Sequence, residues 1–206
     1  MELKIITIPV GPLDVNCYIV YNNSNDKALI IDPGGDFSLI EEQLKIINKC
    51  AGAVFVTHCH FDHVMAVKQF NMMGVPVFMN EKELDFINSN ANLAKYFGIK
   101  FIPFSVDNRL IEGFLDVCGY KIQVFETHGH TIGSVCLQIE DALFTGDTLF
   151  KESYGRTDFP TGSMKQLVLS IKKLFAMDEN LRVYPGHNEP TTIKAEKIYN
   201  PINLLL

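Results

Sequence analysis

The first fifty residues alternate between short apolar runs and polar turns. Residues 4–8, 17–21 and 28–31 have the length and the β-branched content that are typical of strands. The polar segment 22–26 joins the second run to the third, and its residue types tolerate turn geometry. Apolar residues then recur at helical spacing over residues 37–49. The pattern predicts antiparallel strands followed by a helix.

The middle of the chain continues this alternation of strands and helices. An uninterrupted apolar run at 53–56 is typical of a buried strand, and a second such run lies at 75–78. We predict a helix over residues 62–70, between these runs, and another over residues 81–97.

The second half of the chain is richer in strands. Apolar residues over 164–175 share one helical face, which predicts an amphipathic helix. No internal repeat or linker is visible, so residues 1–206 are predicted to form a single domain. Two groups of strands, each mixed with helices, indicate an α/β fold of two packed sheets with helices outside. Strands are predicted at 122–125, 134–139, 142–145 and 182–184.

Composition narrows the class of protein. Of the 206 residues 47% are hydrophobic, which suits a substantial core, and the formal net charge is -6. No basic stripe is present, so we expect no nucleic-acid partner. The five cysteines show no close pairing, which favours a reducing compartment over a disulfide framework. We see no basic leader and no apolar run near the roughly 20 residues of a membrane helix, and we expect a cytoplasmic protein without a membrane partner.

The densest chemistry lies directly after the strand 53–56. The run Thr57-His58-Cys59-His60-Phe61-Asp62-His63 contains three of the six histidines of the chain and one carboxylate. Three histidines this close are hard to explain as packing, because each buried ring needs its own hydrogen-bond partner. Imidazole and carboxylate are usual ligands of zinc and similar ions. The run therefore predicts a metal site, and its spacing suits two adjacent ions.

Further candidate ligands follow strands farther along the chain. His130 and His187 lie at strand-to-loop junctions, and Asp147 follows the strand 142–145 with two oxygens that could bridge two ions. Taken alone, each has an ordinary alternative: a lone histidine is often structural, and an aspartate after glycine often forms a turn or caps a helix. Their joint presence beside the first run favours a site of two divalent ions.

These segments together resemble the metallo-β-lactamase superfamily, whose signature T-H-x-H-x-D-H reads here as residues 57–63. The segments 32–34, 130–134, 146–150 and 185–187 match the companion motifs in the same order. The resemblance implies a four-layer αββα sandwich of two mixed β-sheets flanked by helices. It also implies one ion on His58, His60 and His130, a second on Asp62, His63 and His187, and Asp147 between them.

Within the superfamily, residues 146–150 and 155–158 are most similar to glyoxalase II, the hydroxyacylglutathione hydrolases. This resemblance implies hydrolysis of a small-molecule thioester such as S-lactoylglutathione by a hydroxide that bridges two metal ions, with zinc expected and iron or manganese as alternatives. Asp62 and Asp147 are the expected catalytic residues. Arg156 matches a basic residue that contacts glutathione, although the C-terminal helical domain of the full-length enzymes has no counterpart here.

Several alternatives stay open at this stage. A persulfide dioxygenase with one iron shares the fold and a similar segment at 155–159, and lactones or phosphodiesters are other substrates of such hydrolases. A metal-stabilised scaffold is the non-enzymatic alternative. Asp32 is either a loop former or a carboxylate that holds a ligand histidine. His128 stands where the family usually has proline and is not an expected ligand, and Cys59 is expected to pack in the core.

Overall fold

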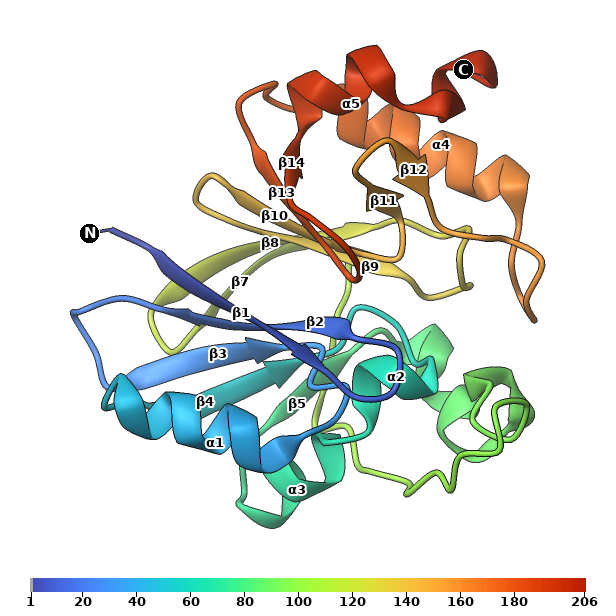
Figure 1. Cartoon of the computed structure of the whole chain (residues 1–206). Helices are drawn as coiled ribbons and strands as arrows, with labels where there is room; N and C mark the ends of the chain where they lie inside the picture. Colours follow the sequence, from blue (N-terminus) through green and yellow to red (C-terminus); the bar gives the residue numbers. More distant parts are fainter. Residues whose placement is uncertain (1) are drawn as a thin grey trace.

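The computed structural model describes residues 2–206 and contains two six-stranded β-sheets that pack face to face, with helices on both outer sides (Figure 1). In the first sheet the strands follow the order of the chain. The first three are antiparallel, and the last four, from β3 onward, run parallel. Its strands are β1 (Lys4–Val10), β2 (Val15–Tyr21), β3 (Lys27–Ile31), β4 (Cys50–Phe55), β5 (Val77–Met79) and β6 (Asn108–Arg109).

The second sheet has the order β14-β13-β10-β9-β8-β7 and one parallel pair, β10 with β13. Its strands are β7 (Gly113–Val117), β8 (Tyr120–Glu126), β9 (Val135–Ile139), β10 (Ala142–Gly146), β13 (Arg182–Pro185) and β14 (Thr191–Thr192). A separate small hairpin consists of β11 (Leu149–Phe150) and β12 (Ser153–Tyr154).

Helices cover the outer face of each sheet. In Figure 1, α1 and α3 lie against the first sheet, and α4 and α5 lie against the second. The α-helices are α1 (Phe37–Ile46), α2 (Phe61–Val64), α3 (Val67–Met72), α4 (Met164–Phe175) and α5 (Ile193–Tyr199), and the 3-10 helices are η1 (Glu81–Asn88), η2 (Asn90–Asn92) and η3 (Pro201–Leu204).

The central strands β2, β3, β9 and β10 are buried on both faces because each sheet lies between helices and the other sheet. In β2, Cys17 and Ile19 belong to the core under α1 and α3, whereas Tyr18 and Val20 belong to the core between the sheets. A period of two with both faces apolar explains why these strands appear in the sequence as apolar runs and not as alternating patterns. The predicted four-layer αββα sandwich is confirmed.

Two predicted helices differ from the structure. The helix expected over 62–70 is interrupted at Ala66, whose N–H donates to the Pro33 carbonyl instead of continuing the helix. The helix expected over 81–97 is wrong in type and length: η1 and η2 are 3-10 helices, and Leu93 ends the second with a φ of 65°. The single domain over 1–206 stays a prediction, and Met1 lies outside the described residues.

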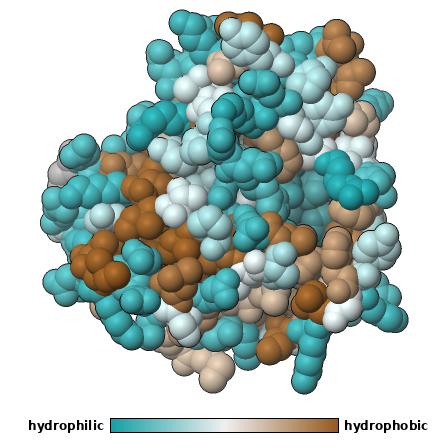
Figure 2. Space-filling view, in the orientation of Figure 1, coloured by the Kyte–Doolittle hydropathy of each residue, from teal (hydrophilic) through white to brown (hydrophobic). Residues whose placement is uncertain are grey.

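Two further features of the molecule are the polarity of its surface and the length of its helices. In Figure 2 the visible face is mostly hydrophilic, and its apolar residues gather at the lower left, over the half that holds the first sheet. Among residues 2–206 no helix is long and apolar enough to span a bilayer.

Candidate metal centre

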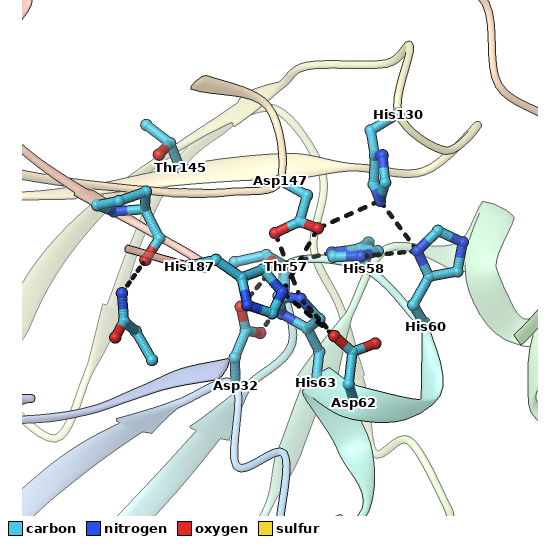
Figure 3. A network of polar contacts seen from close by, with 12 residues as sticks. Asp32, Thr57, His58, His60, Asp62, His63, His130, Thr145, Asp147 and His187 are labelled. Carbon is cyan, nitrogen blue, oxygen red and sulfur yellow. Dashed lines mark hydrogen bonds and ion pairs between the residues drawn. The ribbon is translucent and has the colours of Figure 1, made fainter. Parts of the chain in front are cut away.

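The predicted ligands meet at one edge of the sandwich because they all follow strands that end there. β4 leads into the loop that carries His58 and His60, and α2 begins directly after that loop. In the second sheet, the parallel strands β10 and β13 end side by side, with Gly146 opposite Pro185. This register brings Asp147 next to His187. The loop between β8 and β9 adds His130, and Figure 3 shows all seven side chains directed at one another.

Three histidines form the first group. Nδ1 of His60 lies 3.1 Å from Nε2 of His58 and 2.9 Å from Nε2 of His130. Nitrogen ligands about 2.0–2.1 Å from a tetrahedral ion lie about 3.3 Å apart, so the three nitrogens surround a point that suits a metal ion. All three rings are buried.

The outer nitrogens of this group have their own partners. Nδ1 of His130 donates to the Arg156 carbonyl over 2.7 Å, and Nδ1 of His58 lies 3.2 Å from the Thr57 hydroxyl. With these Nδ1 atoms engaged, Nε2 of both rings is directed to the centre. Metal-binding histidines are usually oriented in this way by a partner on the other nitrogen.

The second group combines one carboxylate, that of Asp62, with two histidines. Nε2 of His187 lies 3.2 Å from Oδ2 of Asp62, and Nε2 of His63 lies 3.7 Å from the same oxygen. Asp147 lies between the groups: its Oδ1 is 3.4 Å from Nε2 of His63, and its Oδ2 is 3.5 Å from Nε2 of His130. A carboxylate in this position can contact ions in both groups.

Asp32 orients a histidine of the second group through a hydrogen bond. Its Oδ2 accepts from Nδ1 of His63 over 3.0 Å and from the Thr57 hydroxyl over 2.7 Å, and its Oδ1 accepts from the Thr57 N–H. Asp32 also has a φ of 49° where β3 turns into the following loop. Both alternatives for this residue therefore hold: it shapes a loop and it orients a histidine of the centre.

Burial keeps the first group neutral. It lowers the pKa of His58 well below its usual value, and the neighbouring His63 and His130 lower it further. Burial, followed by the charge of His130, lowers the pKa of His60 to about 3. Burial also lowers the pKa of His130. Neutral imidazole is the form that binds metal, so these rings are ready to do so at neutral pH.

In the second group, neighbouring carboxylates raise the pKa values of the histidines. Burial alone lowers the pKa of His63, but Asp147, Asp62 and Asp32 raise it well above the usual value. His187 follows the same pattern, because the hydrogen bond to Asp62 and the charge of Asp147 outweigh burial. Burial raises the pKa of Asp147, yet the histidines around it hold that pKa well below its usual range.

Three buried polar atoms of the centre lack a hydrogen-bond partner within the protein: Nε2 of His60, Nε2 of His63 and Oδ1 of Asp147. Orphaned buried atoms are costly, and two of these face the centre itself. Three sets of donor atoms lie within metal-binding reach of one another, namely His58-His60-His130, His58-His63-Asp147 and Asp62-His63-His187. The donor set fits two divalent ions, and its nitrogen and oxygen atoms suit zinc, iron or manganese alike.

Close packing at Gly186 explains how the carboxylate and the histidine loop approach each other. A Cβ at this position would lie 2.2 Å from Oδ1 of Asp147 and 2.7 Å from Cε1 of His63. Only glycine fits between these side chains. The proline-glycine pair before His187 therefore serves the geometry of the centre.

A cleft of 360 Å³ opens over the metal centre, and its walls are largely apolar. Arg156 and Phe159 belong both to this cleft and to an adjacent cavity of 610 Å³ that also contains Lys95 and Tyr96. Within the cleft, apolar walls come from Leu13, Phe61, Leu93, Phe97, Phe150 and Phe159.

Arg156 makes separate contacts through its backbone and through its side chain. Its carbonyl holds His130, while its guanidinium pairs with both carboxylate oxygens of Asp158 at 2.7 and 2.6 Å and lies 3.9 Å from the Phe159 ring centroid. The side chain is exposed at the mouth of the cleft. The sequence suggested a substrate contact for this residue but gave no sign of the Asp158 pair.

Two other sequence candidates lie away from the centre. His128 contacts Glu126 at 3.0 Å and Lys82 at 3.1 Å and takes no part in the histidine cluster. Cys59 is buried in the core under α1 and α3, as predicted. The sequence does not reveal the apolar walls of the cleft, because Leu93 and Phe97 lie in a segment expected to be helical.

Comparisons with known proteins agree with this geometry. The family model described as the metallo-beta-lactamase superfamily matches residues 10–187. The probable metallo-hydrolase YqgX of Bacillus subtilis is 33% identical, with 94% of each chain covered. Hydroxyacylglutathione hydrolase GloC of Haemophilus influenzae is 32% identical, with 97% of each chain covered.

Two solved structures are similar over nearly their whole length. The BLEG-1 B3 metallo-beta-lactamase superposes with a TM-score of 0.90 at 35% identity, covering 98% of this chain and 99% of that one. TTHA1623 in a di-iron-bound form superposes with a TM-score of 0.86 at 30% identity, covering 96% and 99%.

Proposed function

The chain belongs to the metallo-beta-lactamase superfamily, and from this premise we propose that it hydrolyses glutathione thioesters with two divalent metal ions. The coarser part of this function, a metal-dependent hydrolase, follows from the family and from the His/Asp cluster. The thioester, the ligand roles of the seven residues and the role of Arg156 are our proposals.

One observation carries the proposal: six histidine and carboxylate donors surround Asp147 at the floor of an open cleft. Structural zinc sites are closed by four protein ligands, whereas catalytic sites keep a position for water or substrate. Seven side chains would be too few to fill the coordination of two ions, and several of them line the open cleft. This arrangement favours an enzyme over a metal-stabilised scaffold.

The ions, when bound, would lower the pKa of a water molecule toward about 7 and polarise the substrate carbonyl. The residues of the chain would position the reacting water and accept its proton. Asp62 is held as a carboxylate by His63 and His187 against the effect of burial on its pKa. Its place at the floor of the cleft lets it orient the attacking water and accept its proton. Asp147 contacts a histidine of each group and so fixes the spacing between the two groups.

Recognition of the thiol carrier is assigned to the mouth of the cleft. The apolar walls suit the acyl chain and exclude water, while Arg156 and Lys95 offer positive charge to the carboxylates of glutathione. The Arg156 guanidinium would exchange Asp158 for a substrate carboxylate, at small cost because the pair is exposed. GloC, which bears the name of a hydroxyacylglutathione hydrolase, supports this substrate class.

The test is an assay of thiol release from S-lactoylglutathione by the protein loaded with zinc, and separately with iron. We expect turnover that rises with metal content up to two ions per chain. The same preparations are assayed with a β-lactam, a lactone, a phosphodiester and, with an oxygen electrode, glutathione persulfide. Faster turnover of any of these, or oxygen consumption with the persulfide, would contradict the proposal.

A matched pair of substrates separates recognition of the acyl group from recognition of the carrier. S-lactoyl-N-acetylcysteamine has the same thioester on a thiol without carboxylates. We expect its KM to exceed that of S-lactoylglutathione by about tenfold, because the charged contacts at the mouth are lost. Equal KM values would mean that the protein recognises the thioester but not glutathione.

A further inference from the structure

A carboxylate outside the metal centre joins the two loops that carry the first group of histidines. Glu83 lies in η1 and is fully buried, although glutamate is rarely buried without partners. Its Oε2 accepts from the Cys59 N–H over 2.8 Å, and its Oε1 accepts from the Gly133 N–H over 2.7 Å. Cys59 stands between His58 and His60, and Gly133 follows His130 by three positions.

These two contacts are specific to one half of the centre. The loop around Cys59 and the loop around Gly133 supply all three histidines of the first group. The second group depends on α2, which holds Asp62 and His63, and on the loop after β13, which holds His187. Glu83 donates or accepts no hydrogen bond with these segments among the described residues.

Both oxygens of Glu83 are needed because both partners are N–H donors. A glutamine has one acceptor oxygen and one NH2 group, so it would leave one backbone N–H facing another donor. An unsatisfied buried N–H is costly, and the loop that carries it would have to move.

Two further observations indicate that the position of Glu83 is fixed. A Cβ at residue 133 would lie 2.7 Å from Cγ and 2.8 Å from Oε1 of Glu83, so the close approach requires glycine. Asn80, at the start of η1, caps the helix by accepting from the Lys82 N–H and donates to the Leu110 carbonyl. The carboxylate therefore projects from an anchored segment and not from a mobile loop.

We propose that Glu83 is a positioning residue that fixes the spacing of His58, His60 and His130 and thereby sets the metal affinity of the first site alone. This inference rests on the metal use in the proposed function but not on the thioester. It assigns a role to a buried charge that neither binds metal nor faces the cleft.

The test measures zinc affinity by competition with a chromophoric chelator, one site at a time. His187→Ala removes a ligand of the second site, so the tighter ion in that background reports on the first site. His130→Ala does the reverse. We expect Glu83→Gln to weaken zinc binding by at least about tenfold in the His187→Ala background and to change it by less than about twofold in the His130→Ala background.

A matched control separates this role from a general loss of stability. Glu196 is also fully buried and accepts from a backbone N–H, that of Glu152, and from the Thr191 hydroxyl, but it contacts neither histidine loop. Glu196→Gln should lower the melting temperature of the metal-free protein without weakening zinc binding at one site more than at the other. Equal weakening of both sites by Glu83→Gln, in step with its melting temperature, would overturn the proposal, as would unchanged affinity at the first site.

A second variant keeps the proposal testable if Glu83→Gln does not fold. Gly133→Ala retains the carboxylate but pushes against it, and it should weaken the first site in the same selective way. Equal weakening of both sites by Gly133→Ala, or an unchanged affinity at the first site, would contradict the proposed contact. Zinc binding needs no substrate, so a protein that binds zinc selectively but leaves thioesters intact would refute the proposed function and leave this inference standing.

Discussion

The first proposed metal site has three histidines that are almost fully shielded from solvent, whereas the second has Asp62, His63 and His187, of which His187 is 22% exposed. The first site takes its ligands from two loops that Glu83 joins. The second takes them from α2 and from the loop after β13, and Asp32 orients only one of its histidines. Asp147 lies between the groups and contacts histidines of both.

This difference separates two tasks. Neutral, buried ligands with fixed partners favour a permanently held ion, because little has to reorganise when the ion binds. A carboxylate-rich and partly open site favours exchange of ligands and the handling of protons. We therefore expect the first ion to be the more tightly held, and the second to be more sensitive to pH and to changes near the cleft.

The largest effect is expected from removing Asp147, the side chain that lies between the two sites. Asp147→Ala should reduce metal content at both sites and lower kcat by about a thousandfold or more, because several kcal/mol of transition-state stabilisation depend on the pair of ions. Elemental analysis after dialysis and the thioester assay measure the two effects. Near-normal turnover with two bound ions would refute the shared role of Asp147.

Lowering the pH should separate the sites without any mutation. In the metal-free protein the pKa values of His63 and His187 are raised above their usual value, whereas those of His58 and His60 are lowered. A raised pKa means that protons compete with the metal at a higher pH. Below neutral pH the second site should lose affinity by about tenfold per pH unit for each displaced proton, while the first site changes little.

Zinc titrations at several pH values between about 5 and 8 test this expectation. The described contacts predict two binding steps that move apart as the pH falls. Steps that weaken in parallel would show that the carboxylates around His63 and His187 do not distinguish the sites.

A smaller effect is expected at Asp32, which contacts the second group but binds no ion in our assignment. Asp32→Asn retains one acceptor oxygen and loses the other, so either Thr57 or His63 loses its partner. We expect affinity at the second site to fall by about 10- to 100-fold, with a smaller change at the first. The His130→Ala background, in which the second site is the tighter one, isolates this effect.

The sequence predicted which side chains converge at the centre, because each follows an apolar strand whose end is marked by histidine, aspartate or glycine. It also predicted most strands and both packed layers. It did not reveal β7, although residues 114–117 alternate and the Cys118-Gly119 pair, with φ values of 53° and 78°, forms a hairpin turn. The alternation there is weak because Phe114, at 80% exposure, replaces a polar residue on the outer face.

Other features could not be found in the sequence for physical reasons. Glu83 looks like any glutamate on a helix surface, and only the tertiary approach of Gly133 turns it into a buried acceptor. The expected helix over 81–97 fails because Asn80 and Ser89 cap short 3-10 turns by accepting from nearby N–H groups. Pairing of β10 with β13 depends on chain crossings that periodicity does not encode.

The smallest effect is expected at Arg156. Its backbone carbonyl contacts His130 of the first site, and its side chain is the proposed contact with the substrate. Arg156→Gln leaves the carbonyl that accepts from His130 in place, so the first site should keep its zinc affinity. The lost guanidinium should raise KM for S-lactoylglutathione by about two- to fivefold, in the range of an exposed ion pair, with kcat nearly unchanged.

Asp158→Asn provides the matched control, because it releases Arg156 from its bidentate partner without removing the cation. If the guanidinium exchanges Asp158 for a substrate carboxylate, this variant should lower KM for the glutathione thioester and leave KM for the N-acetylcysteamine thioester unchanged. A KM that rises in both variants would mean that the Arg156–Asp158 pair shapes the mouth of the cleft as a unit. In that case the positive charge that recognises the carrier would have to come from Lys95, which also lines the adjoining cavity.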